Sequence, residues 1–249
     1  MVTIGIIGGS GLDNPDILSG SRDEAVTTAW GMPSSSLKRG TIGGVKVVLL
    51  ARHGREHTIP PSQVNYRANI AALKEAGCTH IVATTAVGSL REDIRRGDLV
   101  IIDQFIDFTK QRKMSYHESF KPNVPSHCAM ADPYDEGLRR LMIEECRRLG
   151  FPFHEKGAVV TIEGPRFSTR AESRMFRSWG MDIINMTVAT ETALANEQGV
   201  PYAAVAMSTD YDSWKVDEEP VSWRAVNKVF EENAARVTAL LTGLIPRIV

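Results

Sequence analysis

The sequence predicts an α/β fold: a single domain, residues 1–249, with a mixed, mostly parallel β-sheet flanked by helices. Short apolar runs rich in Val and Ile alternate with helical patterns along the chain. Most of these runs are continuously apolar, as in strands that are buried on both faces. The 249 residues contain no repeat and no linker rich in Pro or Ser, which favours one domain over two.

The elements follow from these two patterns. Strands are expected at Thr3–Ile7, Val45–Leu50, His80–Thr84, Leu99–Ile102, Ala158–Ile162, Asp182–Asn185 and Tyr202–Met207. Helices are expected at Gln63–Ala76, Asp135–Leu149, Thr169–Trp179, Glu191–Gln198 and Ser222–Leu244. A glycine directly follows three of these helices, at Gly77, Gly150 and Gly199, as at helix C-caps. Thr169 and Glu172 have the spacing of a capping box.

The last expected helix has the clearest amphipathic pattern. Apolar residues recur along it at helical spacing, and Asn233 is the one polar residue in the series: Val226, Val229, Phe230, Asn233, Val237, Leu240, Leu241 and Leu244. By contrast, the segment from about Thr109 to Pro133 has no regular pattern. Irregular segments of this length in compact domains usually carry function.

Composition excludes several functional classes. The formal net charge of -1 predicts no broad basic surface for nucleic acid or membrane. No apolar run is long enough to span a membrane, and the N-terminus does not have the pattern of a signal peptide. The 3 cysteines are scattered, which fits neither a disulfide framework nor a zinc motif. We therefore expect a cytoplasmic protein without a metal site.

Polar loops follow several expected strands, and the first is rich in glycine. Gly8–Gly11 brings backbone N–H groups and the Ser10 hydroxyl to one place, which suits an anion. A dinucleotide-binding loop fits poorly, because the spacing is not G-x-G-x-x-G and Pro15 follows where the helix should continue. A plain tight turn is the alternative.

Two further loops carry hydrogen-bond donors. Arg52–His57 holds two arginines and two histidines directly after a buried strand, and such side chains are strong donors to an oxyanion. The alternative is a solvated basic loop. Thr84–Ser89 offers hydroxyl and N–H groups, although Ser and Thr also form local hydrogen bonds in ordinary turns.

Three loops carry aromatic, sulfur or acidic side chains. Phe167 could stack on a base or belong to the core, and Met186 could pack on a sugar or fill a core gap. Asp210 and Asp212 follow a buried strand at i and i+2, and paired acids can divide a protonated and an ionised role. The alternative is an acidic cap, because Glu218 also lies nearby. Together the loops suit an enzyme that holds an anion at one end and a leaving base at the other.

These segments resemble the trimeric purine nucleoside phosphorylase family, and within it the members that act on 5′-methylthioadenosine. The resemblance runs from about Ile4 to Pro246. It is carried by IGIIGGSGLD, LLARHGREHTIPPSQVNYRANI, TTAVGSLREDIRRGDLVIIDQFID, VTIEGPRFSTRAESRMFRSWG, INMT and MSTDYDSW. It implies a nucleoside phosphorylase-like fold and a homotrimer with sites at subunit borders. It also implies no metal or organic cofactor, with inorganic phosphate as co-substrate.

The resemblance also implies which residues form the site. The implied phosphate site consists of Ser10, Arg52, His53, Thr85, Ala86 and Thr187, with Arg55 and His57 in the same loop. The implied nucleoside site consists of Phe167, Ser168, Met186, Asp210, Asp212, Val226 and a His127 from the neighbouring subunit.

The implied reaction is phosphorolysis of 5′-methylthioadenosine to adenine and 5-methylthioribose 1-phosphate. Asp210 with a raised pKa would be the catalytic acid for the purine N7. The nearest alternative is a broader purine nucleoside phosphorylase that acts on adenosine or 6-oxopurine nucleosides. More distant alternatives are a hydrolytic nucleosidase, an NAD-linked oxidoreductase and a non-catalytic nucleoside-binding module.

The chain departs from the family pattern near the expected 5′ pocket. Trp223 stands where the family has a small aliphatic residue, and no proline precedes Glu191. The C-terminal segment that closes this pocket in the larger animal enzymes does not follow Val249. We expect Trp223 to supply part of that cover.

Overall fold

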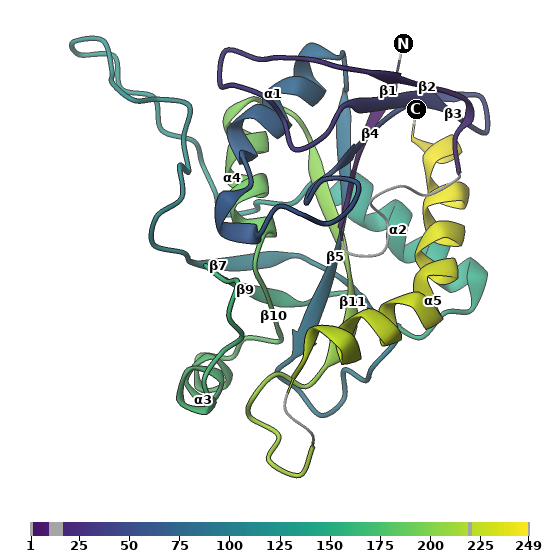
Figure 1. The fold of residues 1–249 in the computed structure, drawn as a ribbon, viewed down its shortest axis with the longest axis vertical. Coiled ribbons are helices and arrows are strands. Elements are labelled where there is room, and N and C mark those ends of the chain that lie inside the picture. The colour runs from purple at the N-terminus through teal and green to yellow at the C-terminus, as the bar shows by residue number, and fades with distance from the viewer. Residues whose placement is uncertain (1, 10–16, 219–220, 249) are drawn as a thin grey trace.

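One mixed sheet forms the centre of the molecule in this computed structural model, which describes residues 2–9, 17–218 and 221–248 (Figure 1). Its 11 strands run in the order β2-β3-β4-β1-β5-β10-β9-β7, with β11 beside β5, β6 beside β11 and β8 beside β6. The bounds are β1 (Thr3–Gly8), β2 (Ser19–Glu24), β3 (Leu37–Ile42), β4 (Val45–Ala51), β5 (His80–Ser89), β6 (Leu99–Ile101), β7 (Gln104–Phe108), β8 (Phe153–His154), β9 (Ala158–Ile162), β10 (Ile183–Asn185) and β11 (Tyr202–Asp210).

The sheet divides at β5. Along one edge, β5 pairs in parallel with β11 from Ile81 to Gly88. Along the other edge, β1 pairs in parallel only as far as Ala83, and β10 pairs antiparallel only at Gly88 and Ser89. Between these two pairings, residues 84–87 have no strand of the described chain beside them on that edge. The fork therefore opens a gap in the sheet where the ends of β1 and β10 approach the middle of β5.

Two pairs of helices cover the sheet (Figure 1). The helices α1 (Tyr66–Glu75) and α4 (Val188–Glu197) pack together on one face, and α2 (Glu136–Leu149) and α5 (Trp223–Leu244) pack together on the other. The short α3 (Arg170–Ser178) packs through Phe176 at a small separate cluster with β9 and β10. Two short 3-10 helices lie at Pro61–Gln63 and Ile245–Arg247. No helix in the described part of the chain is long and apolar enough to cross a membrane.

The capping residues that the sequence predicts lie at helix ends in the structure. Thr169 and Glu172 form both hydrogen bonds of a capping box, and Gly150 ends α2 in the left-handed conformation with φ 67°. The amphipathic pattern of α5 is also confirmed, because it buries Val226, Phe230, Val237, Leu240, Leu241 and Leu244. The prediction for α4 was wrong by one turn at its start, since this helix begins at Val188 rather than Glu191.

The predicted α/β class is confirmed, and each predicted strand and helix has a counterpart. The strands β2, β3, β7 and β8 were not predicted. β2 is exposed along most of its length, so it lacks the apolar run that identifies a buried strand. Residues 109–133 form no helix or strand, as expected, and project as a long teal arm at the upper left of Figure 1.

Candidate active site

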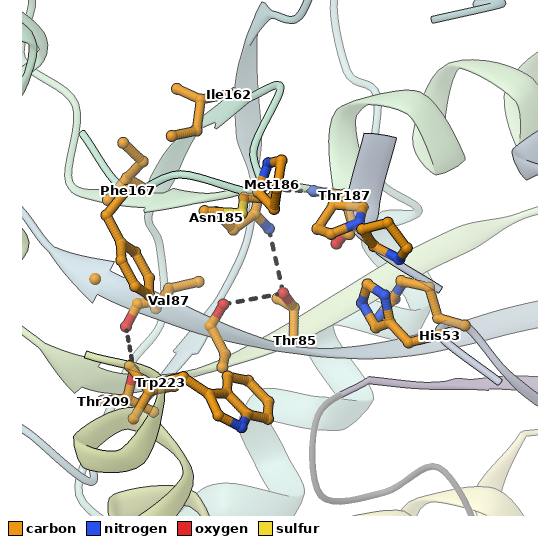
Figure 2. Close-up of a pocket in the computed structure, with 18 of the residues that line it drawn as sticks. His53, Thr85, Val87, Ile162, Phe167, Asn185, Met186, Thr187, Thr209 and Trp223 are labelled. Carbon is orange, nitrogen blue, oxygen red and sulfur yellow. Dashed lines mark hydrogen bonds between the residues drawn. The ribbon is translucent and has the colours of Figure 1, made fainter. Parts of the chain in front are cut away.

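A cavity of about 450 Å³ lies at the fork of the sheet. Its walls come from the loop after β4, the middle and end of β5, the ends of β10 and β11, and the first turn of α5 (Figure 2). Figure 2 shows Thr85 and Asn185 on the floor between His53 at one end and Phe167 at the other. Segments that are far apart in the sequence therefore meet at this cavity.

A buried ion pair anchors one end of the cavity. Arg52 donates from Nε to Oε1 of Glu191 at 2.5 Å and from Nη2 to Oε2 at 2.9 Å. Its Nη1 donates to the Thr84 carbonyl at 2.9 Å, and the Tyr202 hydroxyl donates to Glu191 Oε2 at 2.7 Å. Burial by itself would lower the pKa of Arg52, but the Glu191 carboxylate outweighs it and the pKa is raised. Arg52 is therefore a fixed cation.

The pair still leaves Arg52 able to bind a ligand. A guanidinium has five N–H groups, and the bonds to Glu191 and Thr84 use three of them. The loop after β1 allows this close packing, because a Cβ at Gly9 would lie 2.5 Å from Arg52 Nη1 and 2.6 Å from the Thr84 carbonyl oxygen. Ser10, the next residue of the predicted phosphate loop, lies outside the described residues.

Hydroxyl groups and a helix start lie beside Arg52. Thr187 is the N-cap residue of α4, but its side chain makes no capping bond, and among the described residues its buried Oγ1 has no hydrogen-bond partner. Asn185 accepts from Thr161 Oγ1 at 2.8 Å and donates to Thr85 Oγ1 at 3.3 Å, which orients the floor. Helix N-termini attract anions. Ala86 also lines the cavity, so the predicted anion-binding residues within the described chain meet here.

His53 also lies at this end of the cavity. Its Nδ1 lies 2.8 Å from the Ile59 carbonyl oxygen, and the ring of His57 lies 4.5 Å away, measured between centroids. Burial, followed by the charge of Arg52, lowers the pKa of His53 to about 3. His53 is therefore neutral, rather than a second cation beside Arg52.

The remaining basic residue of this loop, Arg55, does not join the site. Arg55 is exposed, pairs with Asp23 and donates to Ser36 Oγ at 3.2 Å, and it does not line the cavity. The expectation that Arg55 assists the phosphate site was therefore wrong. His57 does line the cavity, between His53 and Trp223.

Two acids form the opposite end of the cavity. Asp210 accepts from the backbone N–H of Asp212 and from Thr209 Oγ1, each at 2.8 Å. Burial raises the pKa of Asp210 to about 6, and burial also raises the pKa of Asp212. Asp212 Oδ2 is buried and has no hydrogen-bond partner among the described residues. This end can therefore both donate a proton and accept a hydrogen bond.

Local backbone geometry turns both acids inward. The pairing of β11 with β5 shifts between Ser208 and Asp210, and Asp212 has a left-handed φ of 45°. The neighbouring Gly88 gives them room, since a Cβ there would lie 2.8 Å from Asp210 Oδ1 and 3.2 Å from Asp212 Cβ. The acids thus face the cavity instead of capping the following segment.

The predicted nucleoside residues of this chain also meet at the cavity. Phe167, Ser168, Met186 and Val226 line it, and the buried Ser168 Oγ has no hydrogen-bond partner in the described structure. His127 does not line it. It is exposed on the projecting arm, where its ring lies 5.5 Å from that of Phe120. Its predicted place in a neighbouring subunit's site stays a prediction.

Trp223 closes part of the cavity wall. Its ring stacks on His57 with centroids 4.8 Å apart and planes inclined by 28°, although 49% of the residue is exposed. It is the first residue of α5, and Val226 lies one turn further on the same side. An aromatic and an aliphatic side chain therefore form this wall, as expected from the sequence.

Sequence reasoning missed the groups that support the site. Glu191 was noted for its place in a helix and for the missing proline before it, but its pairing with Arg52 was not predicted, nor were the roles of Asn185, Thr161 and Tyr202. The one sequence signal for such a group was Arg52 itself, because a guanidinium requires a carboxylate partner if it is buried. Which carboxylate it is depends on tertiary packing, since Glu191 lies 139 residues away in the sequence.

Residues 3–246 match the model of the Phosphorylase superfamily. The chain belongs to this superfamily. An S-methyl-5′-thioadenosine phosphorylase from Xenopus tropicalis is 54% identical over 250 positions, covering 99% of this chain and 89% of the relative. The methylthioadenosine phosphorylase from Schistosoma mansoni, solved in complex with adenine, has a TM-score of 0.94 and 42% identity, covering 100% of this chain and 92% of that chain.

A second solved structure bears on the nucleoside end. It is a mutant of the adenosine/methylthioadenosine phosphorylase from Schistosoma mansoni in complex with methylthioadenosine. Its TM-score is 0.92 at 41% identity, covering 100% of this chain and 92% of that chain. The family resemblance found in the sequence is thus confirmed.

We predict that Glu191→Ala lowers the free energy of unfolding by about 3–5 kcal/mol, because it leaves Arg52 buried without a counter-charge. Denaturant unfolding at fixed protein concentration measures this. Asp23→Ala is the matched control, since it breaks an exposed arginine pair, and it should leave the unfolding midpoint nearly unchanged. Equal effects of the two substitutions would contradict the central role of the Arg52–Glu191 pair.

Proposed function

We propose that the chain cleaves 5′-methylthioadenosine with inorganic phosphate to adenine and 5-methylthioribose 1-phosphate. The observation that carries this proposal is one cavity with two chemically different ends. Arg52, hydroxyl groups and the start of α4 surround one end, and two buried acids stand at the other. The similarity to enzymes named S-methyl-5′-thioadenosine phosphorylase supports the same reaction.

In this proposal the phosphate lies beside Arg52 and the sugar lies against Met186. The phosphate site consists of Ser10, Arg52, His53, Thr85, Ala86 and Thr187. The phosphate oxygens are held by the two N–H groups of Arg52 and by the Thr187 hydroxyl, none of which has a partner among the described residues. Phe167 and Ser168 lie beside the purine. Fixing the two reactants in one orientation is itself a large part of the rate enhancement.

The two acids form different hydrogen bonds with the edge of the purine. Protonated Asp210 donates to N7, which makes the purine a better leaving group. Asp212 accepts from the 6-amino group through its carboxylate. A 6-oxopurine would instead place an acceptor opposite Asp212 and leave its oxygen unpaired, so the site favours 6-aminopurines.

The reaction balances with hydrogen phosphate as the nucleophile. The bond from the sugar C1′ to the purine nitrogen breaks, its electron pair goes to the purine, and a phosphate oxygen forms the new bond to C1′. Asp210 supplies the proton that the purine gains at N7. The new ester loses the proton of hydrogen phosphate to solvent, and Asp210 regains one proton from solvent, so no net proton is consumed.

Adenosine is a second candidate substrate. The solved relative from Schistosoma mansoni is named an adenosine/methylthioadenosine phosphorylase, and the purine end of the two nucleosides is identical. In this proposal, the wall that includes Trp223 and Val226 lies beside the 5′ group, where the two nucleosides differ.

We further propose a cytoplasmic homotrimer in which the projecting arm places His127 at a neighbouring cavity. The arm supports this assembly, because Phe120 is 47% exposed and Val124 is 63% exposed. Exposed apolar side chains on a long segment are typical of an interface. The free cysteines Cys78, Cys128 and Cys146 suit a reducing compartment.

We predict that adenine release from 5′-methylthioadenosine requires phosphate, because Arg52 and its neighbours hold the attacking anion. Purified protein should release adenine and a sugar 1-phosphate in phosphate buffer, as followed by chromatography. The same protein in phosphate-free buffer is the control. Equal adenine release in both buffers would favour hydrolysis and contradict the proposal.

We predict that Asp210→Asn lowers kcat/KM for 5′-methylthioadenosine by roughly 10²–10⁴-fold, since an amide cannot transfer a proton to N7. In the unmodified enzyme, the protonated fraction of Asp210 falls as pH rises above its pKa of about 6. The kcat/KM at saturating phosphate should fall with it, and this pH dependence should disappear in the variant.

The matched control is Asp217→Asn, which neutralises an exposed acid that does not line the cavity. It should keep both the activity and the pH profile. Full activity of Asp210→Asn would show that Asp210 is not the proton donor.

We predict that Trp223→Ala raises KM for 5′-methylthioadenosine more than KM for adenosine. Burying a methylthio group against an aromatic ring favours it over a hydroxyl by roughly 10–200-fold, and an opened wall loses this advantage. Trp179→Ala is the control, because Trp179 is 46% exposed and packs on Phe108 and Phe176, outside the cavity. An unchanged ratio of the two kcat/KM values would exclude Trp223 from 5′ recognition.

A further inference from the structure

The ring of His53 is held in one orientation. Its Nδ1 lies 2.8 Å from the carbonyl oxygen of Ile59, and the His57 ring packs against it with centroids 4.5 Å apart. The residue is 5% exposed, and it lines the cavity (Figure 2). His53 therefore presents a fixed edge to whatever occupies the anion-binding end.

This geometry decides which ring nitrogen carries the proton. A carbonyl oxygen can only accept a hydrogen bond, so Nδ1 of His53 must be the donor to Ile59. A second proton would place a cation next to the fixed charge of Arg52 in a buried site. The ring is therefore neutral, and Nε2 carries a lone pair. Among the described residues, Nε2 has no hydrogen-bond partner.

The neighbouring groups have the opposite character. The guanidinium of Arg52 can only donate hydrogen bonds. The hydroxyls of Thr85 and Thr187 can donate or accept. His53 Nε2, by contrast, can only accept, and an anion without a proton would face it lone pair to lone pair.

We propose that His53 selects a tetrahedral oxyanion that carries an O–H group, which donates to Nε2. Hydrogen phosphate and hydrogen arsenate meet this requirement at neutral pH, and sulfate does not. This inference rests on the proposed function only in placing the anion beside Arg52. It assigns His53 as the residue that distinguishes phosphate from sulfate, rather than as another source of positive charge.

The first test is anion binding without turnover. Phosphate, arsenate and sulfate are titrated into the protein by calorimetry at pH 7 and constant ionic strength, in the absence of nucleoside. Phosphate and arsenate should bind at least about tenfold more tightly than sulfate, because sulfate leaves a buried acceptor unpaired. Equal affinities for sulfate and phosphate in the unmodified protein would overturn the proposal.

Variants separate selectivity from general affinity. His53→Ala removes the acceptor, so the ratio of phosphate to sulfate affinity should fall toward one. The matched control, His80→Ala, removes a histidine at the start of β5 that does not line the cavity, and it should preserve the ratio. An unchanged ratio in folded His53→Ala would also overturn the proposal.

A direct measurement on the unmodified protein covers the case in which His53→Ala does not fold. Nitrogen-15 spectra of the histidine rings distinguish the two neutral tautomers and the charged form. His53 should appear as the Nδ1–H tautomer at pH 7, and a signal from a protonated Nε2 would refute the assignment. Selective phosphate binding without turnover would contradict only the proposed function, and phosphate-dependent turnover without selectivity would contradict only this inference.

Discussion

The buried pair of Arg52 and Glu191 is the interaction on which the site depends. It joins the loop after β4 to α4, and through Thr84 and Tyr202 it also reaches β5 and β11. Two charges in a dry interior are costly to desolvate, and only a bidentate geometry with further hydrogen bonds offsets that cost. The pair is nearly neutral as a unit. Arg52 therefore serves mainly as a rigid source of directed N–H groups, rather than as a mobile charge that could collapse onto any anion.

The second constraint is the division of the sheet at β5. A continuous sheet would satisfy residues 84–87 with a neighbouring strand and leave no cavity. Because β1 pairs with β5 only as far as Ala83 and β10 runs antiparallel to β5, the anion-binding loops and the two acids meet at one gap. Gly88 matters for the same reason, since it leaves room for Asp210 and Asp212 at the bulge of β11. The spacing between the two ends of the cavity is thus a property of strand pairing.

Much of this arrangement could be predicted from the sequence, and the exceptions have physical causes. Buried strands and amphipathic helices have periodic patterns, so their existence was predicted, whereas the polar, exposed β2 has none. Loops at strand ends identified Arg52, Thr85 and Asp210, because strand ends are where α/β sheets bind ligands. Side-chain pairing was not predictable: whether Arg52 meets Glu191, or Arg55 meets Asp23, depends on packing between distant segments. The protonation state of His53 likewise depends on one backbone carbonyl.

Burial acts on both ends of the cavity in the same direction, toward neutral groups. It raises the pKa of Asp210 to about 6 and lowers the pKa of His53 to about 3, so burial favours the neutral form of both groups. Arg52 keeps its charge, and the carboxylate of Glu191 offsets it. The chemical consequence is that the charges that develop as the purine departs meet oriented protein groups at fixed positions. Such preorganised groups stabilise a transition state more strongly than solvent can, because they need no reorganisation.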